Sequence, residues 1–161
     1  MFTSTEIFDL AIRIEENGEA FFRSAVKKIA EPSLKSLFEW LAEQEVKHKE
    51  WFTKRKDRAE MMIAPSDLEK AGSGILQNIL GDQSFSLGEA DLDRMSSVRE
   101  ILDLAIEFER DTILFFEMIL SLIVDEATGT ELKEIIAEEN RHIELLREKV
   151  SLGNEALEMA H

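Results

Sequence analysis

Six residues of metal-binding type recur at one spacing in the two halves of this 161-residue chain. They are Glu15, Glu45 and His48 in the first half and Glu109, Glu139 and His142 in the second. The offset is 94 residues in all three pairs, from 15 to 109, from 45 to 139 and from 48 to 142. Four carboxylates and two imidazoles suit iron or manganese, whereas nothing here offers a soft ligand to copper(I). The pattern predicts a centre that holds two metal ions, with iron favoured and manganese as the alternative.

All six side chains fall on the apolar faces of predicted helices. Glu15 follows Ala11 by four residues and precedes Phe22 by seven, and the two Glu-x-x-His motifs follow Leu41 and Ile135 by four. Residues at these spacings share one helix face. Unpaired buried carboxylates are costly, and a pair of divalent cations would neutralise four of them. A four-helix bundle with one Glu on each of two helices and Glu-x-x-His on each of the others builds such a centre.

Simpler explanations exist for each motif taken alone. A single Glu-x-x-His in a Glu-rich helical protein is more often a solvated helix face, and Glu15 alone could be a surface acid. Two of the three histidines, however, fall in the motif, in register with two further glutamates at one offset. Coincidence is therefore the weaker explanation, and a site that keeps this geometry without binding metal is the remaining alternative. The third histidine, His161, is assigned to the terminal tail.

Composition excludes several other kinds of site and partner. The chain has no cysteine, which excludes disulfides, zinc–thiolate sites and iron–sulfur clusters. Its net charge is −15, from 34 acidic and 19 basic residues, and this argues against a nucleic-acid partner. No basic leader followed by an apolar run is visible, and no segment approaches the length of a membrane span. We expect a cytoplasmic protein without a membrane partner.

Helical signals dominate the chain. The expected helices cover about residues 4–30, 32–62, 97–124 and 129–152. Thr3, Ser97 and Thr128, each followed three residues later by a glutamate, are the predicted N-caps of the first, third and fourth helices. Pro32 suits the first turn of the second. Because the loops within each pair are short, helices one and two, and likewise three and four, should form antiparallel hairpins.

The segment 64–96 between the two hairpins is much longer than an antiparallel turn requires. It is long enough to travel the length of a bundle and to start the third helix at the opposite end. The predicted fold is therefore all-α, a ferritin-like four-helix bundle of two antiparallel hairpins joined by a long crossover. A single domain covers residues 1–161, since the crossover is too short to bury a core of its own. The repeat further predicts that the hairpins pack about a pseudo-twofold axis.

These motifs resemble those of the rubrerythrin family of ferritin-like proteins. The resemblance covers roughly residues 3–62 and 97–150 and is carried by AIRIE at 11–15, EVKH at 45–48, AIEFE at 105–109 and ENRH at 139–142. Full-length members also carry a cysteine-ligated iron, so a chain without cysteine implies an external electron-donor protein. Phe22 and Phe116 stand where the family usually has tyrosine, and Gly18 and Thr112 stand where an additional glutamate would occur.

The resemblance implies a non-haem di-iron oxidoreductase that reduces hydrogen peroxide or dioxygen. Glu15 and Glu109 would then be terminal ligands, Glu45 and Glu139 bridging ligands, and one histidine would bind each metal. No catalytic residue beyond these ligands and no organic cofactor is predicted.

Two other functions are compatible with the same residues. One is a ferroxidase or iron-handling role, and the other is a non-catalytic bundle that a bound metal pair holds together. The resemblance also implies a homodimer, for which the apolar residues Trp40, Trp51 and Met61 are interface candidates. Both tryptophans are equally compatible with packing between helices.

Overall fold

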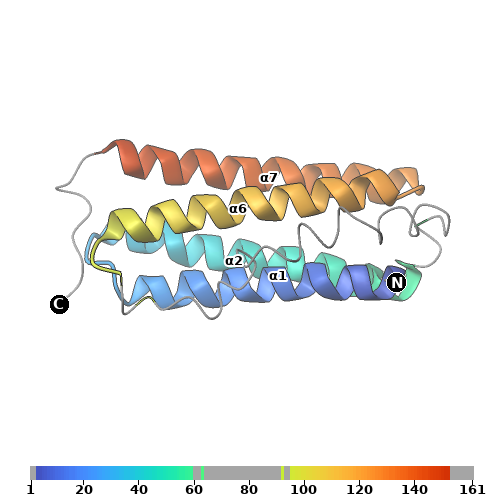
Figure 1. Ribbon diagram of the computed structural model, residues 1–161, viewed down its shortest axis with the longest axis horizontal. Helices are drawn as coiled ribbons and strands as arrows, with labels where there is room; N and C mark the ends of the chain where they lie inside the picture. Colours follow the sequence, from blue (N-terminus) through green and yellow to red (C-terminus); the bar gives the residue numbers. More distant parts are fainter. Residues whose placement is uncertain (1–2, 60–62, 64–91, 93–94, 153–161) are drawn as a thin grey trace.

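The computed structural model describes residues 3–59, 63, 92 and 95–152. Four long helices make up nearly all of this part of the chain (Figure 1). They are α1 (Ser4–Val26), α2 (Pro32–Arg55), α6 (Val98–Leu122) and α7 (Glu126–Ser151), with a short 3₁₀ helix η1 (Lys56–Arg58) after α2. With 23 to 26 residues each, they are about 35–39 Å long. The prediction of an all-α four-helix bundle is confirmed.

Local sequence signals account for where the helices begin. Thr3 forms a reciprocal capping box with Glu6, and the hydroxyl of Ser97 accepts a hydrogen bond from the backbone of Glu100. Both predicted caps are confirmed. The cap predicted at Thr128 is wrong, because α7 begins three residues before the expected 129, and Asp125 is its N-cap. The Thr128 amide and hydroxyl donate to the Asp125 carboxylate, at 2.9 and 2.6 Å.

The helices end earlier than the periodicity predicted. α1 ends at Val26 instead of about residue 30, because the chain must reverse before Glu31, which is held extended ahead of the proline that opens α2. α6 ends at Leu122 because Ile123 is extended and forms an isolated bridge with Ile63. The regular α-helix of α2 gives way to η1 after Arg55, and the expected end at 62 lies outside the described residues.

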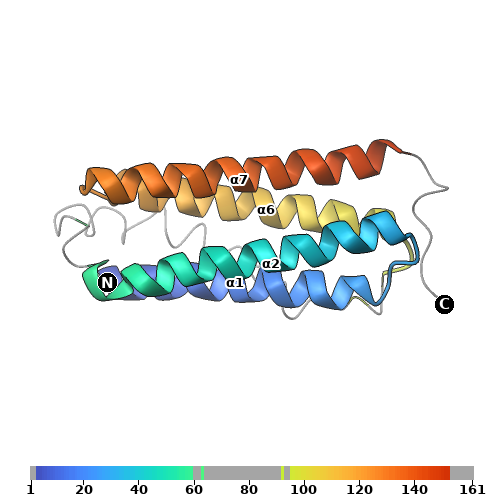
Figure 2. The ribbon, with the colours of Figure 1, turned by 180° about the vertical axis from the view of Figure 1, so that it is seen from behind.

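The helices form two antiparallel hairpins, α1–α2 and α6–α7, that lie side by side (Figures 1 and 2). α2 and α6 run in the same direction in both views. The chain therefore leaves α2 at one end of the bundle and enters α6 at the other, which confirms the crossover connection. Of the predicted crossover 64–96, only residues 92, 95 and 96 are described. No helix in the described part of the chain is apolar enough over a sufficient length to span a membrane.

Aromatic side chains fill the core and link the two hairpins. Phe52 of α2 packs edge-on against Phe8 of α1, at 5.8 Å between ring centroids, and in a tilted arrangement against Phe116 of α6, at 5.0 Å. Each of these rings is fully buried, and burial of one such side chain contributes roughly 1.5–3 kcal/mol. Leu10 and Leu104 pack against this core at its margin and are partly buried.

Candidate metal centre

The bundle interior contains a cluster of ionisable side chains in the middle of its apolar core. Its members are the six residues singled out by the repeat, Glu15, Glu45, His48, Glu109, Glu139 and His142. The four glutamates are fully buried, and the two histidines are 3% or less exposed. The prediction that all six point into the bundle is confirmed. Each helix supplies one glutamate, and α2 and α7 add one histidine each, because the i,i+3 spacing puts Glu and His on one helix face.

Donor atoms of the cluster form two overlapping groups of four. One group is Glu15, Glu45, His48 and Glu139, and the other is Glu45, Glu109, Glu139 and His142. Within each group the donor atoms all lie within 4.8 Å of one another. Glu45 and Glu139 belong to both groups, and Glu15 and Glu109 belong to one each. This sharing is compatible with the bridging and terminal roles that the family resemblance implies, and the binding of metal by these residues stays a prediction.

Both histidines turn the same ring nitrogen toward the carboxylates. The Nδ1 atom of His48 lies 2.7 Å from Glu139 Oε1 and 3.7 Å from Glu15 Oε1. The Nδ1 atom of His142 lies 3.4 Å from Glu139 Oε2 and 3.5 Å from Glu109 Oε2. The two rings are nearly parallel, with centroids 6.0 Å apart. Nδ1 is thus the atom with which each imidazole would reach a metal, because Nδ1 is the ring nitrogen beside the carboxylates of the cluster.

The cluster does not satisfy its own hydrogen-bonding capacity. Nine of its buried side-chain oxygen and nitrogen atoms have no hydrogen-bond partner among the described residues. They include both carboxylate oxygens of Glu15, Glu45 and Glu109 and both ring nitrogens of His142. Buried polar atoms are rarely left in this state. Metal ions bound between the carboxylates would satisfy these lone pairs, so the donor set fits a two-metal centre.

Electrostatics of the carboxylates support the same conclusion. Burial raises the pKa of Glu15, Glu45 and Glu109 well above its ordinary value, and the negative charge of Glu139 raises it further. Although burial opposes it, Glu109 and both histidines hold the pKa of Glu139 well below its ordinary value. Protein groups alone therefore stabilise the charge of only one of the four carboxylates.

For the two histidines, burial and the neighbouring carboxylates shift the pKa in opposite directions. Burial alone would lower their pKa, but hydrogen bonds with Glu138 and Glu139 raise that of His48 to about 10. Interactions with Glu109 and Glu139 likewise raise the pKa of His142 to about 9. Without metal, protons on the imidazoles and carboxylates must neutralise the cluster. Divalent cations would have to displace those protons in order to bind.

Two residues near the centre were missed or misread at the level of sequence. Gly18 was noted only as the place of an absent glutamate, yet a Cβ there would lie 3.1 Å from Glu45 Oε2 and 3.0 Å from Phe108 Cε1. Because Gly18 has only a hydrogen atom in place of Cβ, it leaves room for the Glu45 carboxylate, which both donor groups share. Glu138 was not singled out, although its Oε2 lies 2.5 Å from His48 Nε2. Glu138 is on α7 and His48 on α2, so no spacing within one helix could have revealed the pair.

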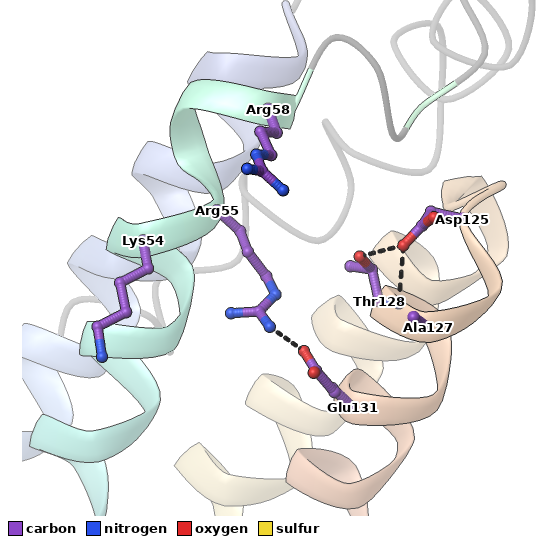
Figure 3. Close-up of a pocket in the computed structure, with 7 residues that line it drawn as sticks. All are labelled: Lys54, Arg55, Arg58, Asp125, Ala127, Thr128 and Glu131. Atoms are coloured by element: carbon purple, nitrogen blue, oxygen red, sulfur yellow. Dashed lines mark hydrogen bonds and ion pairs between the residues drawn. The ribbon is translucent and has the colours of Figure 1, made fainter.

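A surface pocket of about 470 Å³ lies apart from the cluster, between the end of α2 and the start of α7 (Figure 3). Figure 3 shows Arg55 of α2 reaching across to pair with Glu131 of α7. Trp51 also donates a hydrogen bond to Glu131, at 2.8 Å. The Arg55 guanidinium lies over the Trp51 ring, 4.6 Å from its centroid. These contacts hold α2 against α7 one to two turns beyond His48. They place Trp51 in helix packing, and Met61 lies outside the described residues.

Comparisons with known proteins agree with the geometry of the site. The family model described as Rubrerythrin matches residues 6–150. Among solved structures, the chain is similar to a Thermotoga maritima protein provisionally described as a ferritin-like diiron-carboxylate protein. The two share 26% sequence identity with a TM-score of 0.64, over 91% of this chain and 93% of that one. No curated protein sequence matches the chain.

Proposed function

Because this chain belongs to the rubrerythrin family, we propose that its buried cluster is a two-metal centre, with iron as the metal, that reduces hydrogen peroxide or dioxygen. The observation that carries the proposal is the overlap of the two donor groups in Glu45 and Glu139. A carboxylate within reach of two positions can bridge two cations and fix their separation. The symmetric arrangement gives each position one terminal glutamate and one imidazole.

Charge balance favours two divalent ions. Four ionised carboxylates carry four negative charges, which two divalent cations neutralise while both imidazoles stay uncharged. Because their pKa is raised, Glu15, Glu45 and Glu109 keep their protons to a higher pH than ordinary carboxyl groups in the absence of metal. Loading should therefore release protons from the carboxylates and imidazoles and become tighter as the pH rises.

The chemistry of the proposed reaction divides between the metals and the protein. A bound ferrous pair would supply the two electrons that, with two protons, convert hydrogen peroxide into two molecules of water. The chain positions the donors inside a hydrophobic core that includes the fully buried rings of Phe22, Phe52 and Phe116. The chain has neither cysteine nor tyrosine. We therefore propose that an external electron-donor protein restores the reduced state.

The composition also supports a second candidate, a metal pair that only holds the bundle together. Such a role needs neither an electron relay nor a second protein, and the absence of cysteine and tyrosine is consistent with it. It predicts that metal raises the melting temperature without turnover.

A ferroxidase that supplies iron for storage would differ in its assembly. A mineral core requires a closed shell of subunits, which the proposed homodimer could not form. Light scattering separates these two assemblies.

The test is anaerobic loading with Fe²⁺, elemental analysis, and stopped-flow oxidation by peroxide. We expect about two iron ions per chain and oxidation faster than that of free Fe²⁺ at the same concentration. The double variant Glu45→Gln/Glu139→Gln should lose both, since it removes the two shared carboxylates. Glu107→Gln/Glu134→Gln makes the same change of charge at exposed positions on α6 and α7 and should lose neither. Full loading with oxidation no faster than free iron would contradict the enzymatic proposal and favour the structural one.

A further inference from the structure

The two halves of the chain repeat the six cluster residues but not the surroundings of the two histidines. His48 Nε2 lies 2.5 Å from Glu138 Oε2, while its Nδ1 faces the cluster. His142 Nε2 has no hydrogen-bond partner among the described residues. The His142 ring instead packs against Trp40 in a T-shaped arrangement, at 5.4 Å between centroids and 80° between planes. One imidazole is therefore held at both nitrogens and the other is held mainly by packing.

A difference in the repeat accounts for the additional hydrogen bond on His48. The residue before the motif glutamate is Glu138 in the second half and Gln44 in the first, at the same offset that relates the cluster residues. Glu138 extends from α7 to the histidine of α2 in the other hairpin. The reciprocal bond from α2 to His142 is absent from the described contacts. Pseudo-twofold symmetry thus relates the membership of the two donor groups but not the partners of the two histidines at Nε2.

A carboxylate at Nε2 has a defined effect on an imidazole ligand. It accepts the Nε2–H hydrogen, which leaves the Nδ1 lone pair free, fixes the orientation of the ring and makes that lone pair more basic. Loss of such a partner generally lowers metal affinity by about 10- to 100-fold. The Glu138 side chain is 53% exposed, so water screens its charge. We therefore expect the lower end of this range.

We propose that Glu138 is a positioning residue that makes the two metal positions unequal, so that the position beside His48 fills before the position beside His142. This inference rests on the proposed two-metal centre and adds an order of filling to it. The order follows because, in the described part of the chain, only His48 has a carboxylate at Nε2 to fix its tautomer and ring orientation, whereas the His142 ring is held by packing without a hydrogen bond at Nε2.

The test uses Co²⁺ as a redox-stable probe, followed by calorimetry and by visible absorption. The unaltered protein should bind two Co²⁺ ions in two steps of different affinity. In Glu138→Gln the tighter step should weaken about tenfold and approach the other, with little change in the weaker step. Glu134→Gln, one turn earlier on the same helix and exposed, makes the same change of charge and should leave both steps unchanged.

A spectroscopic measurement separates positioning from a general loss of structure. In the Co²⁺-loaded protein, a hydrogen bond to Glu138 should protect the His48 Nε2–H from exchange and give a sharp shifted proton resonance. Glu138→Gln should broaden or remove that resonance while the melting temperature without metal stays within a few degrees of that of Glu134→Gln. Two steps that Glu138→Gln leaves unchanged would overturn this inference alone. No binding of Co²⁺ by the unaltered protein would overturn the two-metal centre as well.

Discussion

Alanine at position 18 tests how closely the bundle is fitted around the cluster. The added Cβ would lie 3.0 Å from Phe108 Cε1, 3.1 Å from Glu45 Oε2 and 3.2 Å from Glu45 Cδ. Phe108 is almost fully buried and cannot turn out to solvent. The methyl group must therefore displace either this ring or the carboxylate that both donor groups share.

Opposing contributions determine the size of the effect. Alanine favours the helical state over glycine by about 0.5–1 kcal/mol. Insertion of a methyl group into a packed interior costs about 1–3 kcal/mol. Gly129 provides the matched control, because a Cβ there meets its nearest neighbours at 3.8 and 4.0 Å, which is ordinary contact. The difference in unfolding free energy between Gly18→Ala and Gly129→Ala should therefore be about 1–3 kcal/mol, the cost of crowding alone.

Denaturant unfolding without metal measures this difference, and Co²⁺ calorimetry measures its effect on the cluster. Gly129→Ala should raise the melting temperature by a few degrees, since 1 kcal/mol corresponds to about 2–4 °C in a chain of this size. Gly18→Ala should lower the melting temperature relative to that control and weaken both binding steps, because Glu45 serves both donor groups. If Gly18→Ala proved as stable as Gly129→Ala and bound metal normally, the argument that this glycine makes room for Glu45 would be refuted.

Two further predictions concern the metal-free protein. Stability should fall as the pH rises from about 6.5 to 10, because the pKa of His48 is raised to about 10 and that of His142 to about 9. The stabilisation from the two protonated histidines is complete below the pKa of histidine in the unfolded chain. It is lost as the pH passes their pKa in the folded protein. The raised pKa of Glu45 also makes stability fall with rising pH, above the ordinary pKa of a glutamate. Urea midpoints that rose between about pH 6.5 and 10 would therefore contradict the raised pKa of the histidines and that of Glu45. Phe52→Ala should cost about 3–5 kcal/mol, because the ring is fully buried between the hairpins. Leu114→Ala, at a side chain 55% exposed, should change stability by less than about 0.5 kcal/mol, and equal losses in the two variants would argue against this packing.

Much of the fold was predictable because its signals are local. Apolar periodicity located all four helices, and Thr3 and Ser97 marked the start of two of them. The sequence did not decide where α7 begins, because Asp125 and Thr128 both have side chains that can cap a helix. There the outcome depends on Ile123, which is already extended in the turn after α6, so that α7 can begin at once behind Asp125.

The amino-acid sequence alone was sufficient to identify the six members of the cluster. A repeat at constant offset and the i,i+3 spacing on apolar faces were enough to bring six side chains into one interior, because helix geometry converts spacing into direction. The tertiary structure alone decided the contacts between helices: the reach of Glu138 to His48, the room that Gly18 leaves for Glu45, and the packing of Trp40 against His142. These contacts depend on the distance and rotation between neighbouring helices, which the packing of the whole core sets and no single helix encodes.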